Sequence, residues 1–168
     1  LLQRARVPSG DSGFRHAGRL SARELVDACL THLEAIEPSL KAWVHVAPQA
    51  VRVAADAIDR ARRQGLPLGP LAGILIGVKD IFNTQDMPTQ MGSPAWTSFT
   101  PGNDARAVSC LRLAGGVIAG KTVTAEYAVH DPGPTVNPHD PECTPGTSST
   151  GSAVAVASYM VPLALGSQ

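Results

Sequence analysis

A lysine at the end of an apolar run is the first residue whose position suggests chemistry. Lys79 follows the segment from Ile74 to Val78, which carries no charged or polar side chain. Burial disfavours the charged form of an amine and lowers its pKa, so a buried Lys79 could act as a general base. A lysine here could equally extend its charged end to solvent, and the adjacent Asp80 could be an ordinary ion-pair or capping group. Lys79 taken alone favours this structural interpretation.

A cluster of hydroxyl side chains is the second candidate. The segment PGTSSTGS, residues 145–152, places Ser148, Ser149, Thr150 and Ser152 on a turn that enters an apolar helical pattern. A helix N-cap with additional serines is the ordinary explanation. The chemical alternative is a proton relay, in which one serine hydroxyl connects the amine of Lys79 to a nucleophilic oxygen. Such an arrangement exists in Ser-Lys variants of the catalytic triad.

A third motif matches a nucleotide-binding pattern without its structural context. Residues 115–122, GGVIAGKT, fit the P-loop pattern GxxxxGK[ST]. A P-loop needs a strand before the motif and a helix after it, whereas here a helical pattern precedes it and Val117 to Ala119 resembles a core strand. The N–H groups of such a strand would be used in sheet pairing. We therefore predict that Lys121 is a strand-end residue and that no nucleotide binds here.

Composition predicts a soluble globular protein. Of 168 residues, 43% are hydrophobic and 17% are charged. The formal net charge is zero and the basic residues are dispersed, which argues against a nucleic-acid or anionic-membrane partner. No apolar run is long enough for a membrane span.

Cys29, Cys110 and Cys143 lack a CxxC spacing, so we expect free thiols and a cytoplasmic location. The start, residues 1–20, has neither an initiator Met nor a signal-peptide pattern, and we expect it to be trimmed.

The elements that would position these residues alternate between helix and strand after about residue 70. Helices are predicted over Ser21–Pro38, Pro48–Gly65, Asp104–Gly116 and Ser152–Met160, and strands over Leu71–Asp80, Val117–Gly120 and Val161–Ser167. Ser21 and Glu24 form a capping-box pattern, and Asp104 is the expected N-cap of the third helix. The alternation predicts an α/β layer architecture, in which functional residues gather at strand ends. Lys79 and the hydroxyl-rich turn both lie at such ends.

Three long segments resemble the motifs of the amidase signature enzymes. They are GPLAGILIGVKDIFNTQDMPTQMGSPAW, DARAVSCLRLAGGVIAGKTVTAEYAV and NPHDPECTPGTSSTGSAVAVASYMVPLALGSQ, which begin at residues 69, 104 and 137. The motifs occur in the family's order at compatible spacing, and the resemblance extends from about Ser21 to the last residue. It implies an α/β amidase-signature fold with a mixed β-sheet core covered by helices on both faces. Residues 1–168 would then form the N-terminal portion of a single domain.

The resemblance also implies a Ser-Ser-Lys triad. Lys79 corresponds to the catalytic lysine and Ser148 to the bridging serine, which the family holds after a cis peptide bond. Gly146, Thr147 and Ser149 would form the supporting loop. The acyl-accepting serine is expected beyond Gln168, in a Gly-Gly-Ser turn whose amides would form the oxyanion hole, so the chain would stop a few residues before its nucleophile. No metal and no cofactor are expected.

Two residues depart from the family pattern. Thr147 replaces a glycine directly before the bridging serine, where a β-branched residue narrows the allowed backbone angles. Cys143 replaces a residue that is commonly arginine, and we interpret it as an ordinary loop cysteine.

The expected activity is hydrolysis of the carbon–nitrogen bond of a small-molecule amide through an acyl-enzyme, in a protein that could form a homodimer. One alternative is the A subunit of a glutamine-dependent amidotransferase, which delivers ammonia to a charged tRNA within a complex. This is the only case in which a nucleic acid is expected. The other alternative is a non-catalytic scaffold with the amidase fold.

Overall fold

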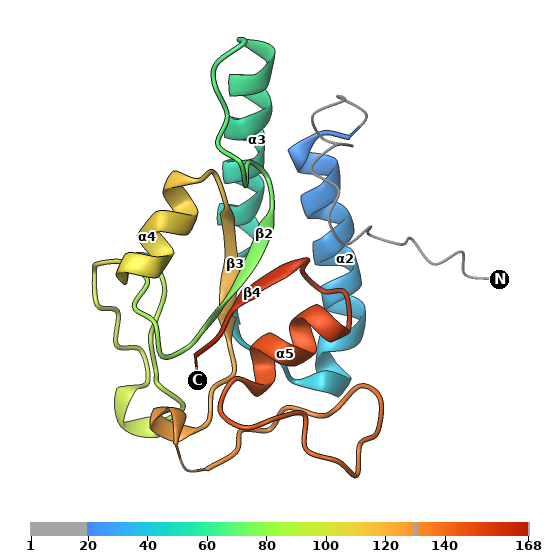
Figure 1. Cartoon of the computed structure of the whole chain (residues 1–168), viewed down its shortest axis with the longest axis vertical. Helices are drawn as coiled ribbons and strands as arrows, with labels where there is room; N and C mark the ends of the chain where they lie inside the picture. Colours follow the sequence, from blue (N-terminus) through green and yellow to red (C-terminus); the bar gives the residue numbers. More distant parts are fainter. Residues whose placement is uncertain (1–19, 130, 168) are drawn as a thin grey trace, which may run out of the picture.

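A four-stranded mixed sheet lies at the centre of the described part of the chain (Figure 1). The computed structural model describes residues 20–129 and 131–167, so the expectations for residues 1–19 and for Gln168 lie outside it. The sheet has the spatial order β1-β3-β2-β4, with strands β1 (Trp43–Val46), β2 (Leu75–Lys79), β3 (Val117–Thr122) and β4 (Leu163–Leu165). Strand β2 is parallel to both β3 and β4, and β1 is antiparallel to β3. The ends of the three parallel strands therefore meet at one edge of the sheet.

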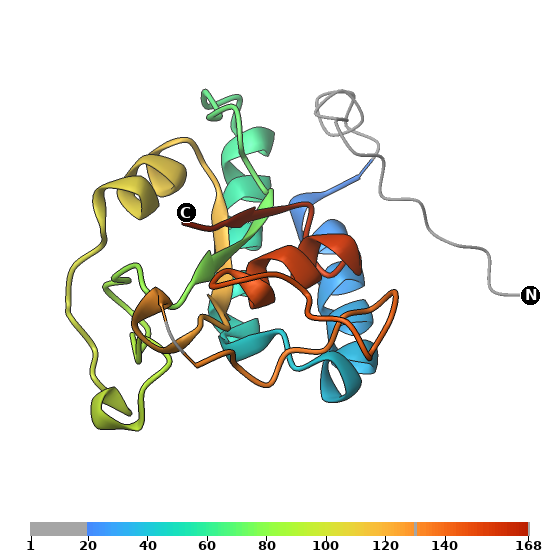
Figure 2. The same ribbon diagram turned by 60° about the horizontal axis from the view of Figure 1, so that its bottom comes forward.

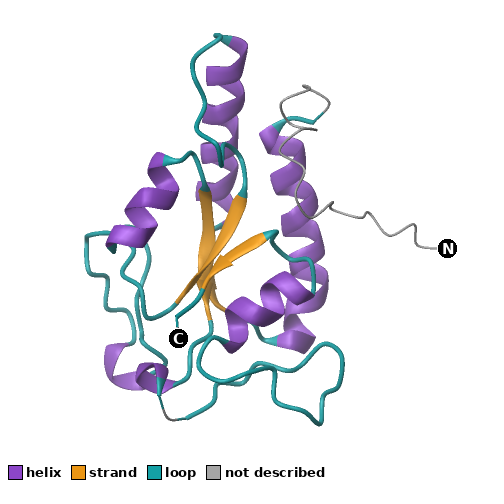
Figure 3. Cartoon of the chain, in the orientation of Figure 1, coloured by secondary structure: helices purple, strands orange, loops and turns teal. Residues whose placement is uncertain are grey.

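Helices cover both faces of this sheet, as expected from the sequence (Figure 3). On one face lie the helices α2 (Ala22–Leu40), α3 (Pro48–Arg63) and α5 (Thr150–Ala157), and on the other lies α4 (Arg106–Leu113). The first core includes Leu75 of β2, packed with apolar side chains of α2, α3 and α5. The second includes Ile76 and Val78 of β2, packed against Val108 of α4. Because side chains alternate along a strand, Lys79 belongs to the α5 face and Asp80 to the α4 face.

The P-loop match is a helix end followed by a core strand, as predicted. Gly115 lies just beyond α4 with a left-handed φ of 87°. Strand β3 follows it, is buried along its whole length, and pairs with β1 on one side and β2 on the other. These pairings use the backbone N–H groups that a phosphate cradle would need.

Several predicted boundaries are wrong for identifiable reasons. Pro38 does not end α2, which continues to Leu40 and stops where Lys41 adopts a φ of 52°. Asp104 does not cap α4, because its carboxylate instead accepts the N–H of Gln85 and pairs with Arg112. Strand β1 was not predicted, because its four residues are too few to show a clear alternation of apolar and polar side chains.

The three cysteines are free thiols, as expected: Cys29 is buried, whereas Cys110 and Cys143 are exposed. Within residues 20–129 and 131–167, no helix is both long and apolar enough to cross a bilayer.

The start of α2 is held by two sets of hydrogen bonds. Ser21 and Glu24 form the predicted capping box: Ser21 Oγ accepts the N–H of Glu24 at 3.0 Å, and the Glu24 carboxylate accepts the N–H of Ser21 at 2.9 Å. The carboxylate of Asp59, on α3, accepts the N–H groups of Ala22 and Arg23 at 2.8 and 3.0 Å. A negative charge at a helix N-terminus is stabilising, so Asp59 fastens α2 to α3.

We expect Asp59→Ala to lower the free energy of unfolding of the full-length protein by about 2 kcal/mol, because one buried and one partly buried N–H group lose a charged acceptor. Asp56→Ala is the matched control on the same helix, since among the described residues Asp56 forms only an ion pair with Arg23, and its own side chain is 42% exposed. Such pairs contribute about 0–1 kcal/mol. Urea denaturation compares the variants, and equal losses would contradict a specific role for the Asp59 hydrogen bonds.

Candidate active site

Lys79 is a buried amine between two hydroxyl groups. It is the last residue of β2 and is 0% exposed. Its Nζ lies 2.7 Å from Ser148 Oγ and 2.8 Å from Ser167 Oγ. No carboxylate forms an ion pair with it within the described ranges. Burial lowers the pKa of Lys79, which favours the neutral amine that a general base requires.

The loop that carries Ser148 is fixed to the sheet through its backbone. The carbonyl of Ser148 accepts the N–H of Ala125, which follows β3, at 3.1 Å. One turn later the N–H of Gly151 donates to the carbonyl of Val123 at 3.2 Å. A Cβ atom on Gly151 would lie 2.3 Å from the carbonyl oxygen of Ala42. The first turn of α5 therefore rests directly on the main chain of the sheet, which sets where Ser148 can lie (Figures 1 and 2).

The expected cis peptide bond before Ser148 is not present, because the peptide bonds of the described chain are trans. A trans bond is favoured by about 3–4 kcal/mol for a non-proline residue. With the trans bond, the hydroxyl of Ser148 lies within hydrogen-bond distance of Lys79, and Gly146 has a φ of 137°.

The remaining predicted loop residues have distinct surroundings. Thr147 is exposed in the described part of the chain. A Cβ atom on Gly146 would meet nothing within 4 Å, so the glycine is needed for its backbone angle and not for space. Ser149 faces the end of β4, where its Oγ donates to the carbonyl of Ser167 at 2.9 Å and accepts the N–H of Ser167 at 3.2 Å.

Ser167 is a site residue that the sequence analysis missed. It lies two residues beyond β4, and its hydroxyl is the second partner of Lys79. Two parallel strands end at the same edge of a sheet, so a polar residue just after β4 must come close to one at the end of β2. That signal was present in the sequence, but using it required knowing that β2 and β4 are neighbours.

A second buried lysine lies on the opposite face of the sheet and is fully paired. Lys121 Nζ lies 2.7 Å from a carboxylate oxygen of Asp80, and both side chains are 0% exposed. The same ammonium donates to Thr89 Oγ1 at 2.7 Å and to the carbonyl of Pro88 at 3.1 Å. Burial raises the pKa of Asp80 and lowers the pKa of Lys121, and their opposite charges counteract both shifts. Lys121 is thus paired with a counter-charge, whereas the amine of Lys79 has none among residues 20–129 and 131–167.

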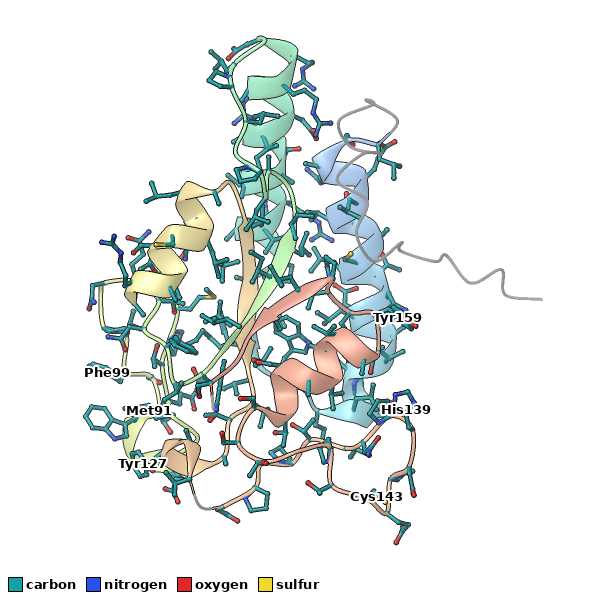
Figure 4. The ribbon with its side chains drawn as sticks, in the orientation of Figure 1. Met91, Phe99, Tyr127, His139, Cys143 and Tyr159 are labelled. Carbon is teal, nitrogen blue, oxygen red and sulfur yellow. The ribbon has the colours of Figure 1, made fainter. Side chains whose placement is uncertain are left out.

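Cys143 lies on the outer loop that precedes the hydroxyl cluster, where Figure 4 shows it below His139 at the margin of the molecule. Its Sγ donates to a carboxylate oxygen of Asp140 at 3.2 Å, and this bond contributes most to lowering the pKa of Asp140. The contact supports the interpretation of an ordinary loop cysteine.

Comparison with known protein families gives one match that spans most of the chain. The family model described as Amidase matches residues 24–168. The chain belongs to the amidase family. This assignment and the covered sheet confirm the fold expected from the sequence.

Amidase relatives extend well beyond the region that aligns with this chain. The chain is 42% identical over 156 residues to the A subunit of glutamyl-tRNA(Gln) amidotransferase from Chloroflexus aurantiacus, covering 89% of this chain and 32% of the relative. Among solved structures, the peptide amidase from Stenotrophomonas maltophilia has a TM-score of 0.85 at 35% identity, covering 94% of this chain and 35% of that one. A bacterial aryl acylamidase has a TM-score of 0.81 at 28% identity, with 88% and 32% covered. The chain spans about a third of the length of these amidases.

Proposed function

We propose that the protein hydrolyses the carbon–nitrogen bond of an amide through an acyl-enzyme, with Lys79 as the general base and Ser148 as the proton relay. The observation that carries this proposal is the buried amine of Lys79, which has no counter-charge among the described residues and lies 2.7 Å from Ser148 Oγ. A paired, charged lysine such as Lys121 could not accept a proton. Residues 1–168 would form the N-terminal portion of one amidase domain, and the nucleophile would be a serine that follows Gln168 in the longer protein.

The proposed reaction uses the relay in both directions. The nucleophilic serine transfers its proton to Ser148 Oγ as Ser148 transfers its own proton to the neutral Lys79, and the serine oxygen attacks the amide carbon. The ammonium of Lys79 then returns the proton through Ser148 to the departing nitrogen, and the carbon–nitrogen bond breaks. Water attacks the resulting ester with the same proton path, which releases the acid and restores the serine.

Ser167 gives Lys79 a defined orientation in this scheme. A neutral amine has one lone pair and two hydrogens, so it can accept a hydrogen bond from Ser148 while it donates one to Ser167 Oγ. Ser149 holds the backbone of Ser167 from both sides. Within the supporting loop of Gly146, Thr147 and Ser149, it is therefore Ser149 that fixes one of the two hydroxyl partners of the base.

An assay with several amides identifies the substrate class, because only the amides that the enzyme accepts release product. The full-length protein is assayed with a peptide C-terminal amide, an aryl anilide and glutamine, with ammonia or aniline as the readout. Hydroxylamine is added in a parallel reaction, because an acyl-enzyme partitions between water and hydroxylamine and yields a hydroxamate. Hydrolysis without any hydroxamate would contradict the acyl-enzyme, and no hydrolysis of any amide would favour the non-catalytic scaffold.

The A subunit of an amidotransferase is the second candidate, because the curated relative at 42% identity has that name. It predicts that glutamine is hydrolysed in preference to the other amides and that the released ammonia reaches a charged tRNA only within a complex. Absence of glutamine hydrolysis, together with turnover of a peptide amide or an anilide, would rule out this candidate.

We place the protein in the cytoplasm, because its free thiols support a reducing compartment. For the stand-alone hydrolase we also propose a homodimer.

Ser148→Ala is expected to lower kcat about a hundredfold or more while the protein remains folded, because a positioned proton relay contributes about 10²–10⁴ to a rate. Ser148 makes no helix cap, so its removal leaves α5 intact. Thr147→Gly is the matched control in the same loop, and its kcat should stay within a fewfold of the parent. Near-parental turnover of Ser148→Ala would remove this serine from the mechanism.

A further inference from the structure

A buried chain of hydrogen bonds crosses β2 on the face that carries Lys79. Ser152 Oγ, on α5, lies 2.9 Å from the carbonyl oxygen of Leu165 and 2.7 Å from Thr122 Oγ1. The Ser152 and Thr122 side chains are 5% and 0% exposed. A carbonyl oxygen only accepts, so Ser152 gives its single proton to Leu165 and must accept from Thr122. We refer to this arrangement of Thr122, Ser152 and the Leu165 carbonyl as the Ser152 bridge.

The bridge connects the two strands on either side of β2 at the level of the base. Thr122, at the end of β3, is the register partner of Lys79. Leu165, at the end of β4, is the register partner of Val78. Ser152 therefore holds together the neighbours of β2 where the side chain of Lys79 leaves the sheet.

A glycine in β2 makes room for the bridge. Gly77 lies two residues before Lys79 and therefore on the same face. A Cβ atom at this position would lie 3.0 Å from Cγ2 of Thr122 and 3.4 Å from the Cβ of Ala164. The ring of Trp43 would lie 3.1 Å from the same atom. Without that atom, the side chain of Thr122 can lie over β2, where its hydroxyl reaches Ser152.

The elements joined by the bridge are the elements that carry both partners of Lys79. Helix α5 follows directly on Ser148 and Ser149, and Leu165 precedes Ser167 by two residues. A change in the spacing between α5, β3 and β4 would therefore move Ser148 and Ser167 relative to Lys79 Nζ. Ser152 itself touches none of these three side chains in the described contacts, so any effect on the base passes through the strands and the helix.

We propose that Ser152 is a positioning residue, whose hydroxyl bridge between Thr122 and Leu165 sets the placement of Ser148 and Ser167 around Lys79. This inference rests on the proposed function. It assigns a role to a serine of the hydroxyl-rich segment that neither caps α5 nor contacts the base. Misplacement of a reacting group by about 1 Å can lower a rate up to about a hundredfold. Loss of the bridge should therefore lower kcat.

The test compares four variants of the full-length protein: Ser152→Ala, Thr122→Val, the double variant, and Thr122→Ser. Each of the first two removes one or both hydrogen bonds of the bridge, whereas Thr122→Ser keeps the donor. We expect kcat per folded molecule to fall about tenfold in Ser152→Ala and Thr122→Val with KM within about twofold. The double variant should be no slower than the slower single variant, because both interrupt one unit, and Thr122→Ser should retain near-parental kcat.

Ser158→Ala is the matched control. Ser158 follows α5, and its hydroxyl has no hydrogen-bond partner in the described structure. Its turnover should equal that of the parent. If Ser152→Ala does not fold, the comparison of Thr122→Val with Thr122→Ser decides the question alone. Unchanged kcat per folded molecule in Thr122→Val, with only a lower melting temperature, would show that the bridge is a packing feature and would overturn the proposal.

A measurement that needs no turnover separates this inference from the proposed function. The ¹³Cε resonances of labelled lysines report the pKa of Lys79 and of Lys121 by NMR. Loosening the bridge admits water to Lys79, so in Ser152→Ala the pKa of Lys79 should move back toward the ordinary lysine value, while Lys121 on the other face is unaffected. If the parent hydrolyses no amide, the proposed function fails, and this titration still decides the bridge. An unmoved Lys79 resonance would overturn it.

Discussion

Replacing Lys79 with methionine is expected to lower the turnover of the full-length protein about a thousandfold or more, as loss of one member of a catalytic triad does. Methionine has a similar length and fills the same space but cannot accept a proton. Ser148 would keep its position and lose the group that receives its proton at 2.7 Å. Amide hydrolysis under single-turnover conditions measures the acylation step directly. Turnover within tenfold of the parent would show that Lys79 is not the base.

The pH dependence of the parent provides a second readout of the same group. A general base works in its unprotonated form, so kcat/KM should rise with pH and level off above the pKa of Lys79. Burial lowers that pKa, so the midpoint of the rise should lie below the ordinary lysine value of about 10.4. A midpoint at or above the ordinary value would contradict a desolvated base.

Lys79→Met should not lower the stability of the protein, which makes the loss of activity interpretable. The pKa of Lys79 is lowered on folding, so below the ordinary lysine pKa the unfolded chain holds a proton more readily than the folded one. Burying this amine is therefore unfavourable near neutral pH, and the penalty disappears only as the pH rises to the ordinary value. An apolar side chain removes it, so the free energy of unfolding of Lys79→Met should equal or exceed that of the parent.

Lys121→Met is expected to have the opposite effect and to lower the free energy of unfolding by about 3–5 kcal/mol. This is the size of the loss when one partner of a buried ion pair is removed and the other charge remains. Among the described residues, Asp80 would stay buried at 0% exposure with only backbone N–H groups, those of Gln90 and Met91, as donors to its side chain. The segment from Pro88 to Gln90, which Lys121 and Asp80 hold by three hydrogen bonds, would lose two of its anchors.

The two lysine variants are best measured together. Both side chains are fully buried, both lie at the ends of neighbouring parallel strands, and both changes are the same. Chemical denaturation should place Lys121→Met well below the parent and Lys79→Met at or above it, while the assay gives the reverse order for turnover per folded molecule. The double variant Asp80→Asn with Lys121→Met tests the origin of the loss, because removing both charges should recover part of the stability. A Lys121→Met protein as stable as the parent would show that the pair does not hold this loop.

The sequence predicted best where local chemistry decides the outcome. The capping box of Ser21 and Glu24 depends on residues three positions apart, and the structure has it. The rejection of the P-loop rested on the order of neighbouring elements, and β3 confirms it. The errors arise where residues far apart in the sequence form contacts that replace the expected local ones. Asp104 was expected to cap α4, but Gln85 and Arg112 hold its carboxylate.

The site shows the same division. Lys79 and the hydroxyl cluster were singled out from the sequence, whereas the catalytic role of Lys79 and the choice of Ser148 within the cluster came from the family resemblance. The structure brings these two residues within 2.7 Å across 69 positions of chain. Ser167 was missed because its closeness to Lys79 follows from the neighbouring positions of β2 and β4, which the order of elements along the chain does not reveal. The cis bond was taken over from the family resemblance and is absent from the described residues.

The direct contact of Gly151 with the main chain of the sheet has a consequence for how this segment can vary. Thr147 and Gly151 lie four positions apart in one short signature, yet the first faces solvent and the second has no room for even one carbon atom. In a saturation library selected for turnover, position 147 should accept many side chains and position 151 almost none. A signature that reads as one uniform block would thus combine a permissive position, 147, with a strict one, 151. An engineer seeking altered specificity should diversify Thr147 and leave Gly151 unchanged.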